Sequence, residues 1–80
     1  IMKQDSLFEA FISDAITYRG EMEISWDCFK IKAKPVGKYM LWHLSYKNNS
    51  RSITSSEDGE IDEIDYVYCW YVSAIVDWGV

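Results

Sequence analysis

The chain has 80 residues, of which 49% are hydrophobic and 16% aromatic, and its formal net charge is −5. This length and composition indicate one folded domain, residues 1–80, with a small core, and they exclude a disordered tail. The acidic balance argues against direct binding of nucleic acid or of an anionic membrane. It favours a partner protein with a basic surface.

The first predicted element is a helix from about Ser6 to Arg19. Asp5 or Ser6 would cap its start, and Gly20 would end it. Apolar residues recur at helical spacing along one face of this segment: Leu7, Phe8, Phe11, Ile12, Ala15 and Ile16.

After this helix, apolar residues alternate with period two, which indicates strands. The alternation shifts by one residue near 27–28, and this predicts a bulge, a bend or two short strands. A turn is expected at 35–37, followed by a strand over Tyr39–Tyr46 with Met40, Trp42, Leu44 and Tyr46 on one face. A hairpin turn is expected at 47–50, where both Asn residues tolerate the left-handed conformation, and it leads to a polar strand at Arg51–Ser55.

The segment Glu60–Gly79 has two interpretations, because its apolar residues fit both the helical and the strand period. Its content of Val, Tyr, Trp and Ile favours a strand. The acids at its start and Gly79 at its end favour a helix. We therefore expect an α+β fold with an N-terminal helix, a three-stranded antiparallel sheet and a C-terminal helix. The alternative is that the last element is a fourth strand.

The expected order of helix, three strands and helix resembles the topology of the double-stranded RNA-binding domain. Lys30, Lys32 and Lys34 would form a basic strand face, with Tyr39 and His43 available for stacking on bases. That family has a lysine cluster at the start of its last helix, where this chain has acids. The departure argues against nucleic-acid binding.

Charge is segregated along the chain. Residues 1–27 carry a net charge of −4, residues 28–56 carry +6, and residues 57–80 carry −7. Acids fill six of nine positions before the last apolar run: Glu57, Asp58, Glu60, Asp62, Glu63 and Asp65. This cluster fits a solvated helix start or a surface that recognises Lys and Arg of a partner. It lacks the residue order of a calcium-binding loop.

The sequence carries no motif that indicates catalysis, a cofactor or a metal site. His43 is the only histidine, and we expect it to be structural or on the surface. Cys28 and Cys69 are expected to be reduced, buried thiols, with a single disulfide as the alternative. The apolar run at 66–76 is about half the length that a membrane span needs. Since no apolar leader is visible at residues 1–20, we expect a cytoplasmic protein.

These observations favour an inhibitor or regulator that binds another protein and is not an enzyme. The six clustered acids would dock on a basic, possibly nucleic-acid-binding, surface of the target, and an exposed aromatic residue would anchor the contact. In size, charge and absence of catalytic motifs the chain resembles small acidic phage-encoded antagonists, including anti-CRISPR proteins, which act in the host cytoplasm. The alternatives are a homo-oligomeric structural or accessory domain, and a nucleic-acid-binding module that uses the basic strand face.

Overall fold

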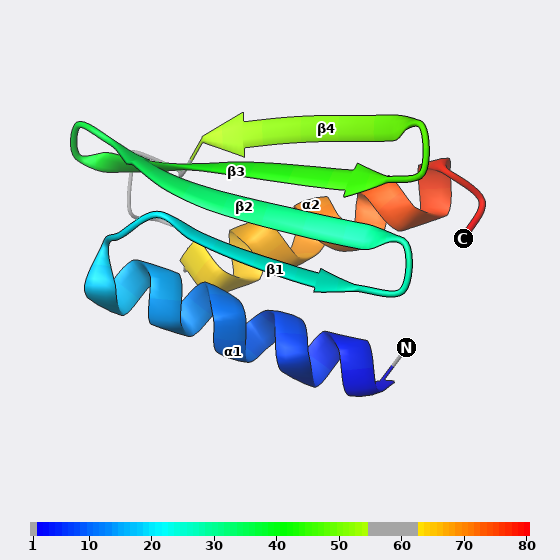
Figure 1. The fold of residues 1–80 in the computed structure, drawn as a ribbon, viewed down its shortest axis with the longest axis horizontal. Helices are drawn as coiled ribbons and strands as arrows, with labels where there is room; N and C mark the ends of the chain where they lie inside the picture. The colour runs from blue at the N-terminus through cyan, green and yellow to red at the C-terminus, as the bar shows by residue number, and fades with distance from the viewer. Residues whose placement is uncertain (1, 55–62) are drawn as a thin grey trace.

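The computed structural model describes residues 2–54 and 63–80, with side chains from Ser6 onward, and these residues form an α+β fold (Figure 1). Two helices, α1 (Met2–Tyr18) and α2 (Glu63–Asp77), lie on one side of a four-stranded antiparallel sheet. The strands lie side by side in chain order, and their bounds are β1 (Met22–Trp26), β2 (Phe29–Val36), β3 (Tyr39–Tyr46) and β4 (Asn49–Thr54).

The expected N-terminal helix is confirmed, but it begins at Met2 and not near Ser6. Its buried face consists of Phe8, Phe11, Ile12 and Ala15, at steps of three, one and three, as helical periodicity requires. Leu7, expected on this face, is 44% exposed. The helix ends at Tyr18, and Arg19, not Gly20, takes the left-handed conformation with φ 51°.

The sheet has four strands, so the expectation of three is wrong and the number given by the alternative is right. The fourth strand does not come from the last segment, however. The shift in alternation at 27–28 is a two-residue turn that separates β1 from β2, with Trp26 paired to Phe29. The topology therefore differs from the three-stranded order of the double-stranded RNA-binding domain.

All three strand connections are two-residue turns whose first residue has a positive φ: 50° at Asp27, 62° at Gly37 and 53° at Lys47. Such turns match the right-handed twist of the strands that they join. Within the expected hairpin turn at 47–50, Lys47 takes the left-handed conformation, and neither Asn48 nor Asn49 does. Pro35 and Val36, expected in a turn, belong to β2.

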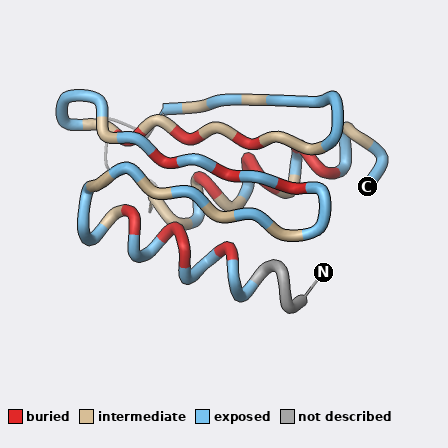
Figure 2. The backbone as a smooth tube through the Cα atoms, in the orientation of Figure 1, coloured by how far each residue is buried: buried red, intermediate tan, exposed pale blue. Residues whose placement is uncertain are grey.

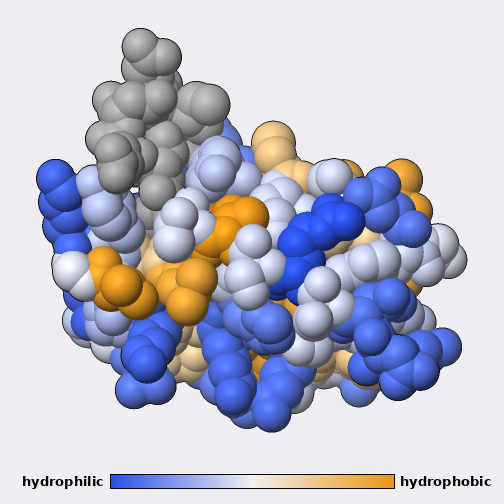
Figure 3. Space-filling view, turned by 90° about the horizontal axis from the view of Figure 1, so that it is seen from above, coloured by the Kyte–Doolittle hydropathy of each residue, from blue (hydrophilic) through white to orange (hydrophobic). Residues whose placement is uncertain are grey.

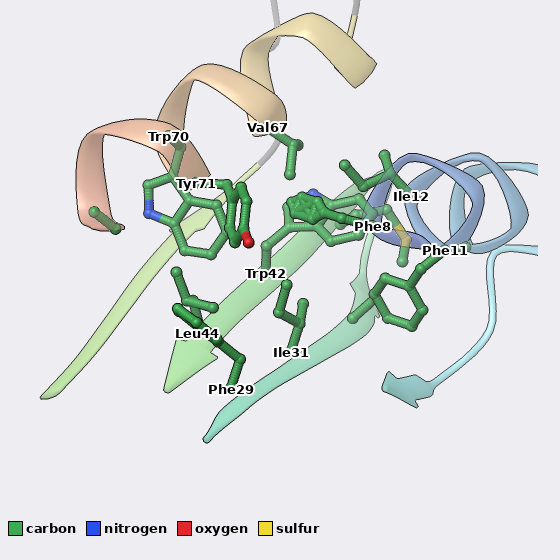
Figure 4. Packing of buried hydrophobic residues seen from close by; sticks show 14 of the residues in the cluster. Phe8, Phe11, Ile12, Phe29, Ile31, Trp42, Leu44, Val67, Trp70 and Tyr71 are labelled. Atoms are coloured by element: carbon green, nitrogen blue, oxygen red, sulfur yellow. The ribbon is translucent and has the colours of Figure 1, made fainter. Parts of the chain in front are cut away.

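The core lies between the sheet and the helices. Buried and exposed residues alternate along β2, and buried and half-buried residues alternate along β3 (Figure 2). The side chains of the two helices point toward those of the strands (Figure 4). The segment from Glu63 is a helix, since its buried residues follow the helical period: Val67, Trp70, Tyr71, Ala74 and Ile75.

Most of the aromatic side chains are used within this core. Of the thirteen, six are buried, six are half-buried, and Tyr18 alone is exposed. The ring of Phe8 stacks on that of Tyr71 with centroids 4.2 Å apart, and Phe29 lies 4.4 Å from Tyr46. The rings therefore connect α1, α2 and the sheet.

Candidate interaction surfaces

The acidic cluster expected to bind a partner is described only in its last part. Glu63 is half-buried and Asp65 is exposed, both in the first turn of α2. Glu57, Asp58, Glu60 and Asp62 lie outside the described residues. Carboxylates at a helix N-terminus interact favourably with the helix dipole, so stability alone gives Glu63 and Asp65 a reason to be there.

Tyr18 lies at the same end of the molecule as this acidic turn, because α1 and α2 run in opposite directions along the long axis (Figure 1). Its side chain is 75% exposed. The next residue, Arg19, donates from Nη2 to the carbonyl oxygens of Gly37 (3.3 Å) and Tyr39 (3.5 Å). These bonds attach the end of α1 to the turn between β2 and β3, and so fix the position of Tyr18.

A second surface is the sheet face that points away from both helices, which we call the open face. Lys30, Lys32 and Lys34 of β2 lie on it, in line along a central strand. Its remaining members come from all four strands: Glu23, Ser25, Val36, Tyr39, Leu41, His43, Ser45, Ser50, Ser52 and Thr54.

The lysines on the open face have one described carboxylate partner. Oxygens of Glu23 lie 3.5 Å from Nζ of Lys30 and 3.7 Å from Nζ of Lys32, and all three side chains are about half exposed. Exposed pairs of this kind contribute at most about 1 kcal/mol. They can therefore be exchanged for contacts with another anion.

His43 lies next to Lys32 in the sheet register, and its Nδ1 is 2.5 Å from Oγ of Ser52 on β4. The sequence analysis missed this contact. The signal that would have found it is the turn at 47–48, because pairing Tyr46 with Asn49 places His43 opposite Ser52. The bond holds the imidazole on the open face.

A shallow hollow of about 400 Å³ lies on the β1 side of this face. Its lining residues include two acids, Glu21 and Glu23, and two lysines, Lys32 and Lys34. The others are Met22, Ala33, Leu41 and His43. Both charge signs meet here, so the hollow by itself selects neither a cation nor an anion.

The described residues include two thiols and no candidate metal site. Among them, no group of three or more His, Cys, Asp or Glu side chains could hold a metal ion. Cys28 and Cys69 are free thiols, and both are exposed, so the expectation that they are buried is wrong. Neither helix, over the ranges described, is long and apolar enough to cross a membrane.

The β4 edge of the sheet has a largely polar surface (Figure 3). Hydrophobic atoms gather mainly in the left half of this view. Along β4, Ser50, Ser52 and Thr54 are exposed, while Ile53 is half-buried. A polar edge strand of six residues is a poor template for pairing with another sheet.

The chain matches no protein-family model, no curated protein and no solved structure. Its function must therefore be argued from these surfaces.

Proposed function

We propose that the protein acts by binding another protein, and that the acidic segment leading into α2 docks on a basic, nucleic-acid-binding surface of that target. The observation that supports this most is the shared location of two features. The acidic first turn of α2 and Tyr18, the one exposed aromatic residue of the thirteen, lie at the same end of the molecule.

The two features contribute differently to binding. Clustered carboxylates raise the rate of encounter with a basic surface and imitate the phosphates that such a surface binds. A large exposed ring supplies apolar contact area, which carries much of the affinity at protein interfaces. An acidic patch beside an aromatic anchor therefore suits an antagonist that competes with nucleic acid.

The test starts from the tagged full chain, used to capture proteins from the cell in which it acts, and continues with the purified captured protein. Glu63→Lys combined with Asp65→Lys should weaken binding by about tenfold or more and reduce its salt dependence. Tyr18→Ser should weaken it further by raising the dissociation rate. An oligonucleotide bound by the target should compete with the wild-type chain.

The matched control is Glu9→Lys with Asp14→Lys, which makes the same change in net charge at two exposed positions of α1. This control should bind as the wild type does. If both double variants bind equally well, or if both lose affinity equally, the acidic segment is not the docking site.

No specific observation favours the homo-oligomeric alternative. It depended on an aromatic surplus that would need a second copy for burial. Twelve of the thirteen aromatic side chains are at least half-buried within this chain.

A further inference from the structure

We infer that the open face of the sheet binds single-stranded nucleic acid along β2. This surface lies on the other side of the sheet from α2, and it uses none of the acids or aromatic residues of the preceding proposal. Either proposal can therefore fail while the other stands.

The open face presents groups that bind phosphate oxygens. On β2, β3 and β4 it offers many hydrogen-bond donors and no carboxylate. The donors are Lys30, Lys32, Lys34, Tyr39, His43, Ser45, Ser50, Ser52 and Thr54. Lysine ammonium and serine or threonine hydroxyl groups are the usual contacts of phosphate oxygens. Two carboxylates lie at the β1 side of this face: Glu23 belongs to the edge strand β1, and Glu21 directly precedes it.

The lysine charges of β2 are arranged in a row. Alternate residues of one strand lie about 7 Å apart, so Lys30, Lys32 and Lys34 form a straight row and not a compact cluster. A row suits an extended polyanion better than it suits a single small anion. No described helix covers this row, because α1 and α2 both pack on the other face of the sheet (Figure 4).

The net charge of −5 by itself disfavours binding of nucleic acid, but the charges near the lysine row matter more. A surface responds mainly to charges within the screening length, which is about 8 Å at physiological ionic strength. The described acids of α2 belong to the helix layer, in a molecule whose shortest extent is 22 Å. The acids of α2 therefore act weakly on the lysine row, and among the described residues Glu21 and Glu23 are the carboxylates that lie beside it.

A single strand fits better than a duplex or an acidic protein segment. A four-stranded sheet face is a platform on which unpaired bases can stack, and the rings of Tyr39 and His43 belong to it. An acidic protein segment would use the lysines but would have no need of these rings. Among the described residues, no helix on this face could enter a groove of a duplex.

The test measures fluorescence anisotropy of labelled oligothymidylate and oligouridylate with the full chain at increasing salt. Three lysine contacts predict that the logarithm of affinity falls with the logarithm of salt concentration with a slope of about −2. Lys30→Gln, Lys32→Gln and Lys34→Gln together should lower the low-salt affinity by about tenfold or more and bring the slope near zero. Glu23→Gln should strengthen binding, because it removes the competing carboxylate.

The matched control compares Lys32→Gln with Lys47→Gln, which change the net charge equally. The ammonium of Lys47 lies 5.2 Å from the ring of Tyr46, in the turn between β3 and β4 and off the row. Only Lys32→Gln should reduce the slope, by about 0.7. Circular dichroism of each variant establishes that it is folded.

Three results would overturn the inference. The first is no change in anisotropy with either oligonucleotide at low salt. The second is a folded triple variant that binds as the wild type does. The third is displacement of the oligonucleotide by polyglutamate of equal charge as effectively as by unlabelled oligonucleotide, which would identify the face as a site for an acidic protein.

Discussion

At single residues of the turns, the backbone takes conformations that cost free energy. Arg19, Asp27 and Lys47 have side chains and yet take positive φ values, whereas Gly37 takes one without a Cβ atom. The left-handed conformation costs a residue with a side chain about 1–2 kcal/mol, because its Cβ approaches the following carbonyl oxygen. The turn between β2 and β3, which begins at Gly37, is therefore the one strand connection that avoids this cost.

We predict that Gly37→Ala lowers the free energy of unfolding by about 1 kcal/mol. A Cβ atom at this position would meet nothing within 4 Å, so the whole effect is conformational. Gly20→Ala is the control, because Gly20 has open space and no positive φ. It should leave the stability unchanged or raise it slightly. Urea denaturation of both variants decides, and equal losses would contradict the prediction.

At the scale of elements, β4 is held to the helix layer by few side chains. It is an edge strand, and Arg51 and Ile53 are its half-buried residues. Nη2 of Arg51 lies 3.0 Å from Oδ2 of Asp77 near the end of α2, and the guanidinium lies 5.7 Å from the ring centroid of Trp78. Arg51 therefore connects the last strand to the last helix.

We predict that a double-mutant cycle on Arg51→Ala and Asp77→Ala gives a coupling energy of about 0.5 kcal/mol, since both side chains are partly exposed. Arg51→Ala alone should cost more than Asp77→Ala, because it also removes the contact with Trp78. Urea denaturation at low and high salt provides the measurement. High salt should reduce the coupling, and a coupling insensitive to salt would argue against an ion pair.

At the scale of the whole molecule, the fold depends on one small core with Trp42 at its centre. Trp42 is 0% exposed, and its ring packs edge-on against Phe11 of α1 at 6.3 Å. Its indole N–H has no hydrogen-bond partner among the described residues, as is also true of the buried N–H groups of Trp26 and Trp70. Shape and apolar area, not hydrogen bonding, therefore give Trp42 its role.

We predict that Trp42→Ala lowers the free energy of unfolding by about 3–5 kcal/mol. A domain of this length has a total stability of about 4–12 kcal/mol, so the variant should be largely unfolded or nearly so. Trp42→Phe should cost much less, because it keeps a ring and removes an unsatisfied donor. Near-UV circular dichroism and urea denaturation provide the measurement.

The control for this prediction is Leu41→Ala, the adjacent residue on the open face of the same strand. It is half-buried and should cost about 1 kcal/mol or less. If Leu41→Ala proves as damaging as Trp42→Ala, the core does not lie where the alternation of β3 places it.

Features that depend on neighbours along the chain can be predicted from the sequence alone. The spacing of Phe8, Phe11 and Ile12 predicted α1, and the alternation of Met40, Trp42 and Leu44 predicted the buried face of β3. The segregation of charge along the chain also follows from the sequence alone. Periodicity is a local property, so the residues of one segment are enough to identify it.

Packing in three dimensions selects between interpretations that fit the sequence equally well. The apolar residues from Ile64 onward fit both a helix and a strand. They form a helix because, as a helix, they cover the large buried side chains of β2 and β3. Strand pairing, which joins residues far apart in sequence, brought His43 to Ser52. Packing of both helices on one face left the lysine row on the other, because burial is decided by the whole set of elements together.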